Sequence, residues 1–194
     1  MPAFAPAFGS AYAVLDFWFG APGSVTHGKT RAEWFKKSDD FDALIRSRFQ
    51  ARYEQAANGQ LARWRESPLP LLALIIVCDQ FPRNMFRDSP KAFATDALAL
   101  DAARHLRARG WDARINTVER QFCYLPFEHA EDLDAQRTCL ALFGELGNAD
   151  LLHWAQKHYD IVERFGRFPH RNAVLGRVST AEETGFLAQP GSRF

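Results

Sequence analysis

The sequence predicts an all-α protein built of antiparallel helix pairs. Apolar residues recur at steps of three and four through most of the chain, as they do on one face of a helix. Typical helix starts and glycine-containing helix ends border these segments, and no stretch shows the alternation of a strand. We expect one helical domain over residues 1–194, with residues 1–66 as a candidate N-terminal subregion packed on a helical-hairpin region, 67–194.

The first clear helix is expected after Ser38. Ser38 is a favourable N-cap residue, and Asn58-Gly59 is a typical helix end. Between them, apolar side chains form one stripe: Phe41, Leu44, Ile45, Phe49, Tyr53 and Ala56. The next helix opens at Ser67-Pro68, because proline suits the first helical position, and we expect it to reach Gln80.

This second helix is apolar nearly all round, which predicts that Pro68–Asp79 forms the buried centre of the fold. We expect Pro82 to end it, because proline disfavours the helical conformation in the residue before it. Ser89-Pro90 repeats the start signal, and a third helix is expected to reach Arg109, with Gly110 as its terminator.

Four helices are expected in the second half of the chain. The first covers about Val118–Tyr124 and should break at Leu125-Pro126. Two longer ones, Asp132–Leu146 and Ala149–Phe165, are joined by a short turn around Gly147. The pattern Ser179-Thr180-Ala181-Glu182 predicts a capping box before a short terminal helix.

Composition excludes several classes of protein. The net charge of +1 gives no global field that favours nucleic acid or acidic membranes. The longest apolar run, Pro68–Cys78, is shorter than the roughly 20 residues of a membrane helix. A signal peptide begins with positively charged residues, and no Lys or Arg precedes Lys29. The 3 cysteines, Cys78, Cys123 and Cys139, lack a C-x-x-C spacing. We therefore expect a cytoplasmic protein without disulfides.

The turn at Gly147 predicts that two oppositely charged segments meet. A short connection makes its two helices antiparallel neighbours, so the start of the first lies beside the end of the second. The acidic segment E-H-A-E-D-L-D (Glu128–Asp134) should then face the basic loop R-F-G-R-F-P-H-R-N (Arg164–Asn172). Such charges could hold the hairpin together, since acids at a helix start and cations at a helix end are both stabilised by the helix dipole. They could also bind a ligand, because arginine recognises carboxylates and phosphates with several donors.

The basic loop carries a specific structural prediction. We expect Phe168 to be buried and Gly166 to end its helix in the left-handed conformation. We further expect Arg167 or Arg171 to contact Glu131 or Asp132.

A second polar segment, D-Q-F-P-R-N, follows the most apolar helix. Asp79 needs a partner there, because an unpaired buried charge is very costly. Arg83 is the expected ion-pair partner, with Gln80 and Asn84 as further donors. This group either pins a helix end or belongs to a functional site.

His158 lies on the apolar stripe Trp154, His158, Ile161 and Phe165, where we expect a core residue. A metal site would require His129, His158 and His170 to converge with an acid, and no H-x-x-x-H or H-E-x-x-H spacing supports that. We expect no metal and no other cofactor.

Three blocks together carry a resemblance: D-Q-F-P-R-N-M-F-R, Y-L-P-F-E-H-A-E-D and R-F-P-H-R-N-A-V-L-G-R. With V-L-D-F-W-F-G, A-F-A-T-D-A-L-A-L and S-T-A-E-E, the chain resembles the bacterial domain-of-unknown-function 924 family over essentially its whole length. The resemblance implies a fold similar to tetratricopeptide-repeat superhelices, a right-handed array of helix pairs, although that repeat's own pattern is absent. It implies no established activity. Glu128 departs from the family pattern, in which an apolar residue follows L-P-F.

The motif residues become the candidate site: Asp79, Gln80, Arg83, Asn84, His129, Glu131, Asp132, Arg167, His170, Arg171 and Asn172. The leading hypothesis is a module that binds a small anionic molecule or a peptide end. Arg167, Arg171 and Arg83 would hold the anion, and His129 and Asn172 would orient it.

Two alternatives stay open. In a hydrolase-like or lyase-like enzyme, His129 or His170 would act as general base, oriented by Glu131 or Asp132. In a structural adaptor, an exposed apolar patch away from these motifs would recruit a protein partner.

Overall fold

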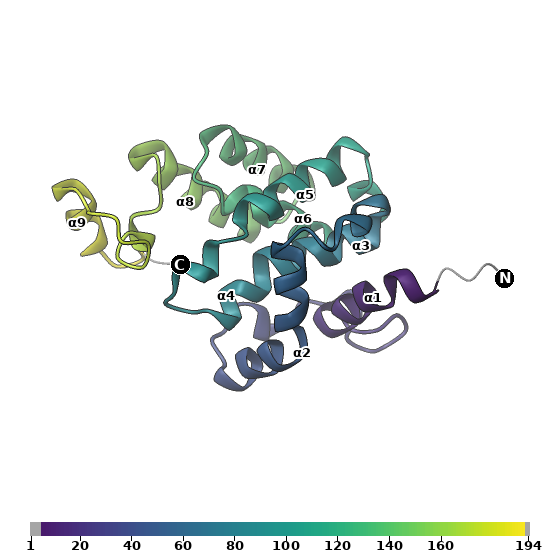
Figure 1. Ribbon diagram of the computed structural model, residues 1–194. Helices are drawn as coiled ribbons and strands as arrows, with labels where there is room; N and C mark the ends of the chain where they lie inside the picture. Colours follow the sequence, from purple (N-terminus) through teal and green to yellow (C-terminus); the bar gives the residue numbers. More distant parts are fainter. Residues whose placement is uncertain (1–4, 193–194) are drawn as a thin grey trace. The chain divides into compact units, whose positions relative to one another are not determined.

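The computed structural model describes residues 5–192, with side chains from Phe8 onward, and every regular element in that range is helical (Figure 1). The all-α class is therefore confirmed. The α-helices are α1 (Ala5–Phe19), α2 (Asp39–Ala57), α3 (Pro68–Ile75), α4 (Phe81–Met85), α5 (Asp96–Ala108), α6 (Thr117–Glu128), α7 (Leu133–Leu146), α8 (Ala149–Phe165) and α9 (Ala181–Leu187). None of the described helices is both long and apolar enough to cross a membrane.

The chain divides into two compact units. Unit 1 consists of the residues up to Arg87 together with Lys91–Pro126. Unit 2 consists of Asp88–Pro90 and the residues from Phe127 onward. The boundary falls inside α6, whose last two residues belong to unit 2.

Local signals set the ends of α2 as expected. The Ser38 hydroxyl oxygen accepts a hydrogen bond from the Phe41 N–H at 3.3 Å, and Asn58 is the C-cap residue. In unit 1, α2 packs against α4, and α3 packs against both α1 and α5. Pro70–Gln80 is buried throughout, as expected for the centre of the fold.

The expectation that Pro82 ends this central helix is wrong. A π-helical turn, Ile76–Gln80, follows α3, and α4 then continues to Met85. Pro82 occupies the first turn of α4, where a missing N–H is tolerated. The carbonyl oxygen four residues earlier, that of Cys78, instead accepts a hydrogen bond from the Thr95 hydroxyl at 2.6 Å. A residue distant in sequence therefore satisfies the group that Pro82 leaves open.

Two further boundaries differ from expectation. The segment after Ser89 is a 3-10 turn, Pro90–Phe93, and α5 begins only at Asp96. The next helix does not break at Pro126 but extends to Glu128 with Pro126 inside it. Pro126 has no N–H to donate to the Phe122 carbonyl oxygen, and α6 ends two residues later.

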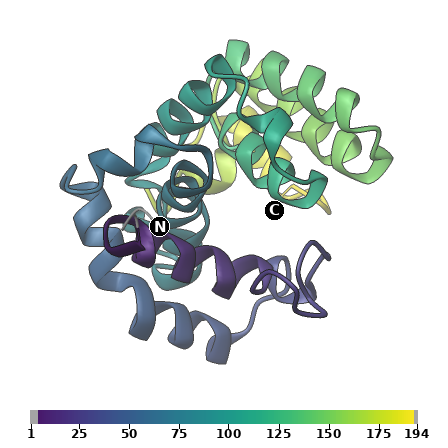
Figure 2. The same cartoon turned by 90° about the vertical axis from the view of Figure 1, so that its right-hand side faces the viewer.

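The hairpin of α7 and α8 in unit 2 is confirmed. Gly147 ends α7 with a φ of 68°, and Asn148 caps α8 through hydrogen bonds from the N–H groups of Asp150 and Leu151. The two helices pack along each other, as Figure 2 shows in green. The capping box before α9 lies one residue later than expected, at Thr180 and Glu183.

Each unit has its own buried aromatic centre. In unit 1 the Trp18 ring packs edge-on against Phe81 and Phe122, each at 5.6 Å between ring centroids. In unit 2, Phe168 is fully buried with Ile161 and Val162. The prediction that Phe168 is buried is confirmed.

Candidate functional site

The π-helical turn of unit 1 places Asp79 and Gln80 in the interior. Asp79 is 0% exposed, and its Oδ2 accepts a hydrogen bond of 2.6 Å from Gln80 Nε2. Arg83 Nη1 lies 3.4 Å from Asp79 Oδ1 and donates to the Asp79 carbonyl oxygen at 2.6 Å. The expected pairing of Asp79 with Arg83 and Gln80 is therefore present.

Arg83 has a second acidic partner, Asp96, that the sequence did not single out. Its two terminal nitrogens donate to the two Asp96 carboxylate oxygens at 2.8 and 2.9 Å. Burial alone would lower the pKa of Arg83, but the charges of Asp79 and Asp96 outweigh it and raise that pKa. Arg83 is thus a shared cation between two carboxylates.

Asn84 does not supplement Asp79 as expected. Its Nδ2 donates to Asp42 Oδ1 at 2.7 Å, and Arg87 also donates to both oxygens of Asp42. The D-Q-F-P-R-N block therefore supplies two separate ion-pair groups of unit 1, one at Asp79 and one at Asp42.

The acidic segment of unit 2 is held by Gln136, a fully buried residue of α7 that sequence reasoning missed. Gln136 Nε2 donates to the carbonyl oxygens of Glu128 at 2.6 Å and Ala130 at 2.8 Å. Asp132 caps α7 by accepting hydrogen bonds from the Asp134 and Ala135 N–H groups. The only sequence signal for Gln136 is a polar residue on an otherwise apolar face.

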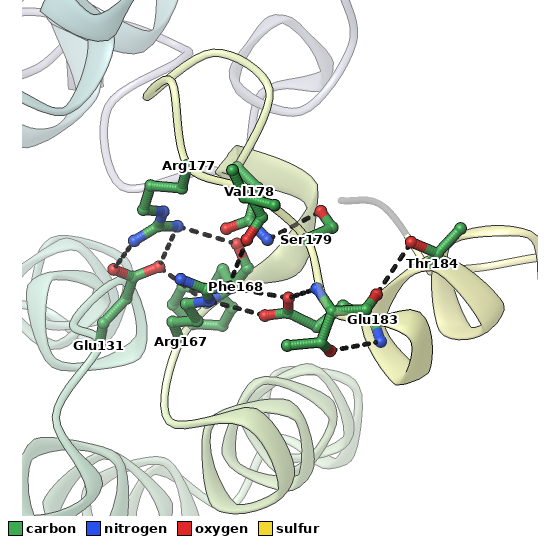
Figure 3. A network of polar contacts seen from close by, with 10 residues as sticks. Glu131, Arg167, Phe168, Arg177, Val178, Ser179, Glu183 and Thr184 are labelled. Carbon is green, nitrogen blue, oxygen red and sulfur yellow. Dashed lines mark hydrogen bonds and ion pairs between the residues drawn. The ribbon is translucent and has the colours of Figure 1, made fainter.

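Glu131 draws the basic loop back onto its own hairpin (Figure 3). Its Oε1 accepts a hydrogen bond of 2.7 Å from the Phe168 N–H, and Arg177 binds both carboxylate oxygens at 2.6 and 2.9 Å. Burial alone would raise the pKa of Glu131, but these donors and the charge of Arg171 outweigh it and lower that pKa. The loop therefore faces Glu131 as expected, and Arg177 was the missed partner.

Arg167, one of the two arginines expected near Glu131 or Asp132, is bonded to Glu183. Its Nε and Nη2 donate to Glu183 at 2.6 and 2.8 Å, and Nη2 also donates to the Val178 carbonyl oxygen at 3.0 Å (Figure 3). The Arg167 hydrogen bonds lower the pKa of Glu183 to about 2. Gly166 ends α8 with a φ of 69°, which confirms the predicted left-handed terminator.

Histidines and Arg171 gather around Phe168 in unit 2. The Phe168 ring centroid lies 5.5 Å from that of His158 and 5.7 Å from that of His170, and the Arg171 guanidinium lies 4.5 Å above the ring. The His129 ring packs against His158 at 6.4 Å. We call His129, His158, His170 and Arg171 the Phe168 cluster.

His158 is buried as expected for a core histidine. Its Nδ1 lies 2.8 Å from the Trp154 carbonyl oxygen and 3.5 Å from Glu128 Oε1. Burial, together with the nearby His129, Arg171 and His170, lowers the pKa of His158 to about 3. The imidazole is therefore neutral near pH 7, and because a carbonyl oxygen only accepts, its hydrogen is on Nδ1.

Both the sequence and the structure of this chain are similar to those of other proteins. The family model described as a bacterial protein of unknown function, DUF924, matches residues 14–191. The chain belongs to the DUF924 family. A solved structure described as a protein of unknown function, ATU0120 from Agrobacterium tumefaciens, is similar with 41% identity and a TM-score of 0.84, over 92% of this chain and 97% of that one. Comparison with the curated proteins gives no match.

The DUF924 blocks therefore fall into two groups. Those of unit 1 supply Asp79, Gln80, Arg83 and Asn84, which lie in ion-pair networks around the π-helical turn. Those of unit 2 supply Glu131, Arg167 and Asn172 to the clasp of the basic loop, where Asn172 Nδ2 donates to Ser179 Oγ at 3.0 Å. Within the described residues, no group of three or more His, Cys, Asp and Glu side chains is arranged to hold a metal ion.

The lowered pKa of His158 predicts a loss of stability at mildly acidic pH. The unfolded chain binds the proton near pH 6.5, whereas the folded protein resists it, so stability is complete above that pH and falls as the pH drops. We expect the free energy of unfolding to fall by about 1–2 kcal/mol between pH 6.5 and 5. Urea unfolding of His158→Gln should show a flatter dependence, while His153→Gln, an exposed histidine of α8, should keep the wild-type slope. Equal pH dependences of stability in the wild type and both variants would contradict a lowered pKa of His158.

Proposed function

We propose that the protein is a binding module for a small molecule or peptide end that carries a carboxylate or phosphate, and that the Phe168 cluster of unit 2 receives this anionic group. The observation that carries the proposal is that Arg171 and His170 both lie against the ring of the buried Phe168, with His158 on the same ring and His129 packed against His158. Arginine and protonated histidine both donate hydrogen bonds to anions, and each such charge-assisted bond is stronger than a neutral one.

The proposal gives the residues of the Phe168 cluster separate roles. Arg171, at 6% exposure, stacks on Phe168 and offers a fixed guanidinium, while half-buried His170 is adjacent to it in the chain. Arg167 is less suited to hold the anion than the sequence suggested, because Glu183 already accepts two of its hydrogen bonds. The proposal therefore assigns the anion to Arg171 and His170, with His129, which packs against His158, as a further donor.

The binding function is better supported than the enzymatic alternative. A histidine base would need a carboxylate to orient it, and Glu131 and Asp132 were the expected partners. Glu131 binds Arg177 and the Phe168 N–H with both oxygens, and Asp132 caps α7. These acids therefore have structural roles that compete with orienting a base.

The fold is compatible with the same proposal. We infer that the helix pairs form a tetratricopeptide-like right-handed array, of which the antiparallel pair α7 and α8 would be one repeat. Such arrays bind their partners on extended concave surfaces. The three free cysteines are buried, in keeping with a reducing cytoplasm.

Thermal-shift measurements with inorganic phosphate and acetate test the proposal. A ligand that binds only the folded state raises the unfolding temperature according to its concentration relative to its Kd. We expect millimolar phosphate to raise the unfolding temperature of the wild type at pH 7. His170→Ala should lose most of this shift.

The matched control is His153→Ala, which removes an exposed histidine from α8 and should keep the full phosphate shift. Arg171→Lys retains the charge but not the planar guanidinium, and we expect it to weaken phosphate binding at least threefold. A phosphate shift that is the same in His170→Ala, Arg171→Lys and the wild type would place the anion site elsewhere.

A further inference from the structure

Unit 1 contains a pocket of about 380 Å³ that the candidate residues do not line. Its walls come from the end of α1, the turn that follows, and the starts of α3 and α6. Leu15, Phe19 and Ile115 contribute apolar surface, and Asp16, His27 and Glu119 contribute polar atoms. Small-molecule sites typically combine such an apolar lining with a few polar groups, in volumes from roughly 300 Å³ upward.

The end of α1 and the turn after it are held in a fixed shape (Figure 2, purple). Arg31 Nη1 donates to the carbonyl oxygens of Phe17 at 2.7 Å and Trp18 at 3.0 Å, which satisfies the end of the helix. Gly20 has a φ of 84°, and a Cβ there would lie 2.4 Å from Thr26 Oγ1. The turn therefore closes tightly on a glycine, and the pocket wall is largely preformed.

His27 lines this pocket, and one of its ring nitrogens is held by the turn. Its Nδ1 lies 2.9 Å from the Gly20 carbonyl oxygen, and because that oxygen only accepts, the hydrogen of the neutral ring is on Nδ1. Nε2 then carries a lone pair. The bond to Gly20 fixes the orientation of the ring, as it does for many ligating and catalytic histidines.

Glu119 adds a nearly buried carboxylate with spare acceptor capacity. It is 7% exposed, and its Oε2 accepts a hydrogen bond of 3.2 Å from the Asn116 N–H. In return, the Glu119 N–H donates to Asn116 Oδ1 at 3.0 Å, which forms a capping box at the start of α6. Within the described residues this is the single donor to the Glu119 side chain, whereas a carboxylate can accept about four hydrogen bonds.

The pocket is therefore rich in acceptors and negatively charged. Among the lining residues Asp16 and Arg114 are both exposed, whereas Glu119 is nearly buried, so the lining carries one net negative charge and its buried charge is a carboxylate. We propose that this pocket is a second binding site, for a small organic cation with an ammonium group on an apolar body. The ammonium would donate to Glu119, Asp16 and His27 Nε2, and the apolar body would lie on Leu15, Phe19 and Ile115. The site is independent of the anion site proposed for unit 2, so either proposal can fail alone.

Titration of the full chain with 2-phenylethylamine, followed by calorimetry and by NMR shifts, tests the proposal. Two probes of similar size separate charge from shape: neutral 2-phenylethanol and anionic 3-phenylpropionate. We expect the amine to bind at least tenfold more tightly than the alcohol, and the propionate to give no saturable binding here. Amide shifts should centre on the end of α1 and the start of α6.

Glu119→Gln is the decisive variant, because glutamine also serves in a capping box and the start of α6 is retained. We expect Glu119→Gln and Asp16→Asn each to weaken amine binding at least fivefold. Asp40→Asn, which removes an exposed acid of unit 1 outside the pocket, should bind like the wild type. The proposal is overturned if the amine shows no saturable binding at millimolar concentration, if alcohol and amine bind equally, or if both pocket variants retain wild-type affinity.

Discussion

Replacing Arg83 by methionine is expected to lower the free energy of unfolding by roughly 3–5 kcal/mol, the range for breaking one side of a buried ion pair. Arg83 binds Asp96 with two hydrogen bonds and lies 3.4 Å from Asp79, whose side chain is fully buried. Methionine retains much of the volume but none of the charge. Two carboxylates would then lose their shared cation in the interior of unit 1, where their charges are poorly solvated.

Arg65→Met is the matched control for this experiment. Arg65 pairs with Asp101 at 2.8 Å, but the Asp101 side chain is 67% exposed, so water solvates the carboxylate after the pair is broken. We expect a loss below about 1 kcal/mol for Arg65→Met. Urea unfolding followed by circular dichroism measures the free energy of unfolding of both variants. A loss at Arg83 no larger than that at Arg65 would mean that the π-helical turn tolerates these charges without their cation.

The helices of this protein were largely predictable because their end signals are local. Ser38 and Asn148 cap helices with their own side chains, and Gly147 and Gly166 end helices in a conformation that glycine adopts without steric penalty. Each signal acts within a few residues. The antiparallel pair of α7 and α8 followed from one such turn.

Proline positions were less predictable, because their effect depends on a distant group. At Pro82 the Cys78 carbonyl oxygen finds the Thr95 hydroxyl, which allows the chain to stay helical through a π-helical turn. Local preference alone favours a break at that position. The same hydroxyl lies just before α5, whose start was placed too early at Pro90.

Ion-pair partners that are distant in the sequence were equally hard to predict. The sequence indicated that Asp79 and Glu131 need partners, and Arg83, only four residues from Asp79, was found correctly. Arg177 was missed because it lies 46 residues from Glu131 in the sequence. The acid bonded to Arg167 is Glu183 of α9, which lies 16 residues away, and not Glu131 or Asp132. The pattern of charges in the sequence predicts that an acid forms an ion pair, but the fold determines which arginine is its partner.

Replacing Glu131 by glutamine is expected to lower the free energy of unfolding by about 2–3 kcal/mol. Glu131 is the common acceptor for the Phe168 N–H and for both terminal nitrogens of Arg177 (Figure 3). The glutamine amide can accept on its oxygen, but its NH₂ group would face an arginine that only donates. The loss should be smaller than for Arg83, because both partners of this pair are partly exposed, at 25% and 23%, whereas the Asp79 side chain beside Arg83 is fully buried.

The pH dependence of this loss identifies the charge as its cause. Arg177 and the Phe168 N–H lower the pKa of Glu131 against the effect of burial, so its contribution is complete above the unfolded value of about 4.3 and is lost as pH falls through the folded value. The gap between wild type and Glu131→Gln should therefore be constant from pH 7 to about 5 and narrow below pH 4. Glu182→Gln, which breaks the exposed pair with Arg164, should cost less than about 1 kcal/mol. If the Glu131→Gln gap persists unchanged at pH 3, the ion pair does not stabilise the loop, and packing of Phe168 alone holds it on the hairpin.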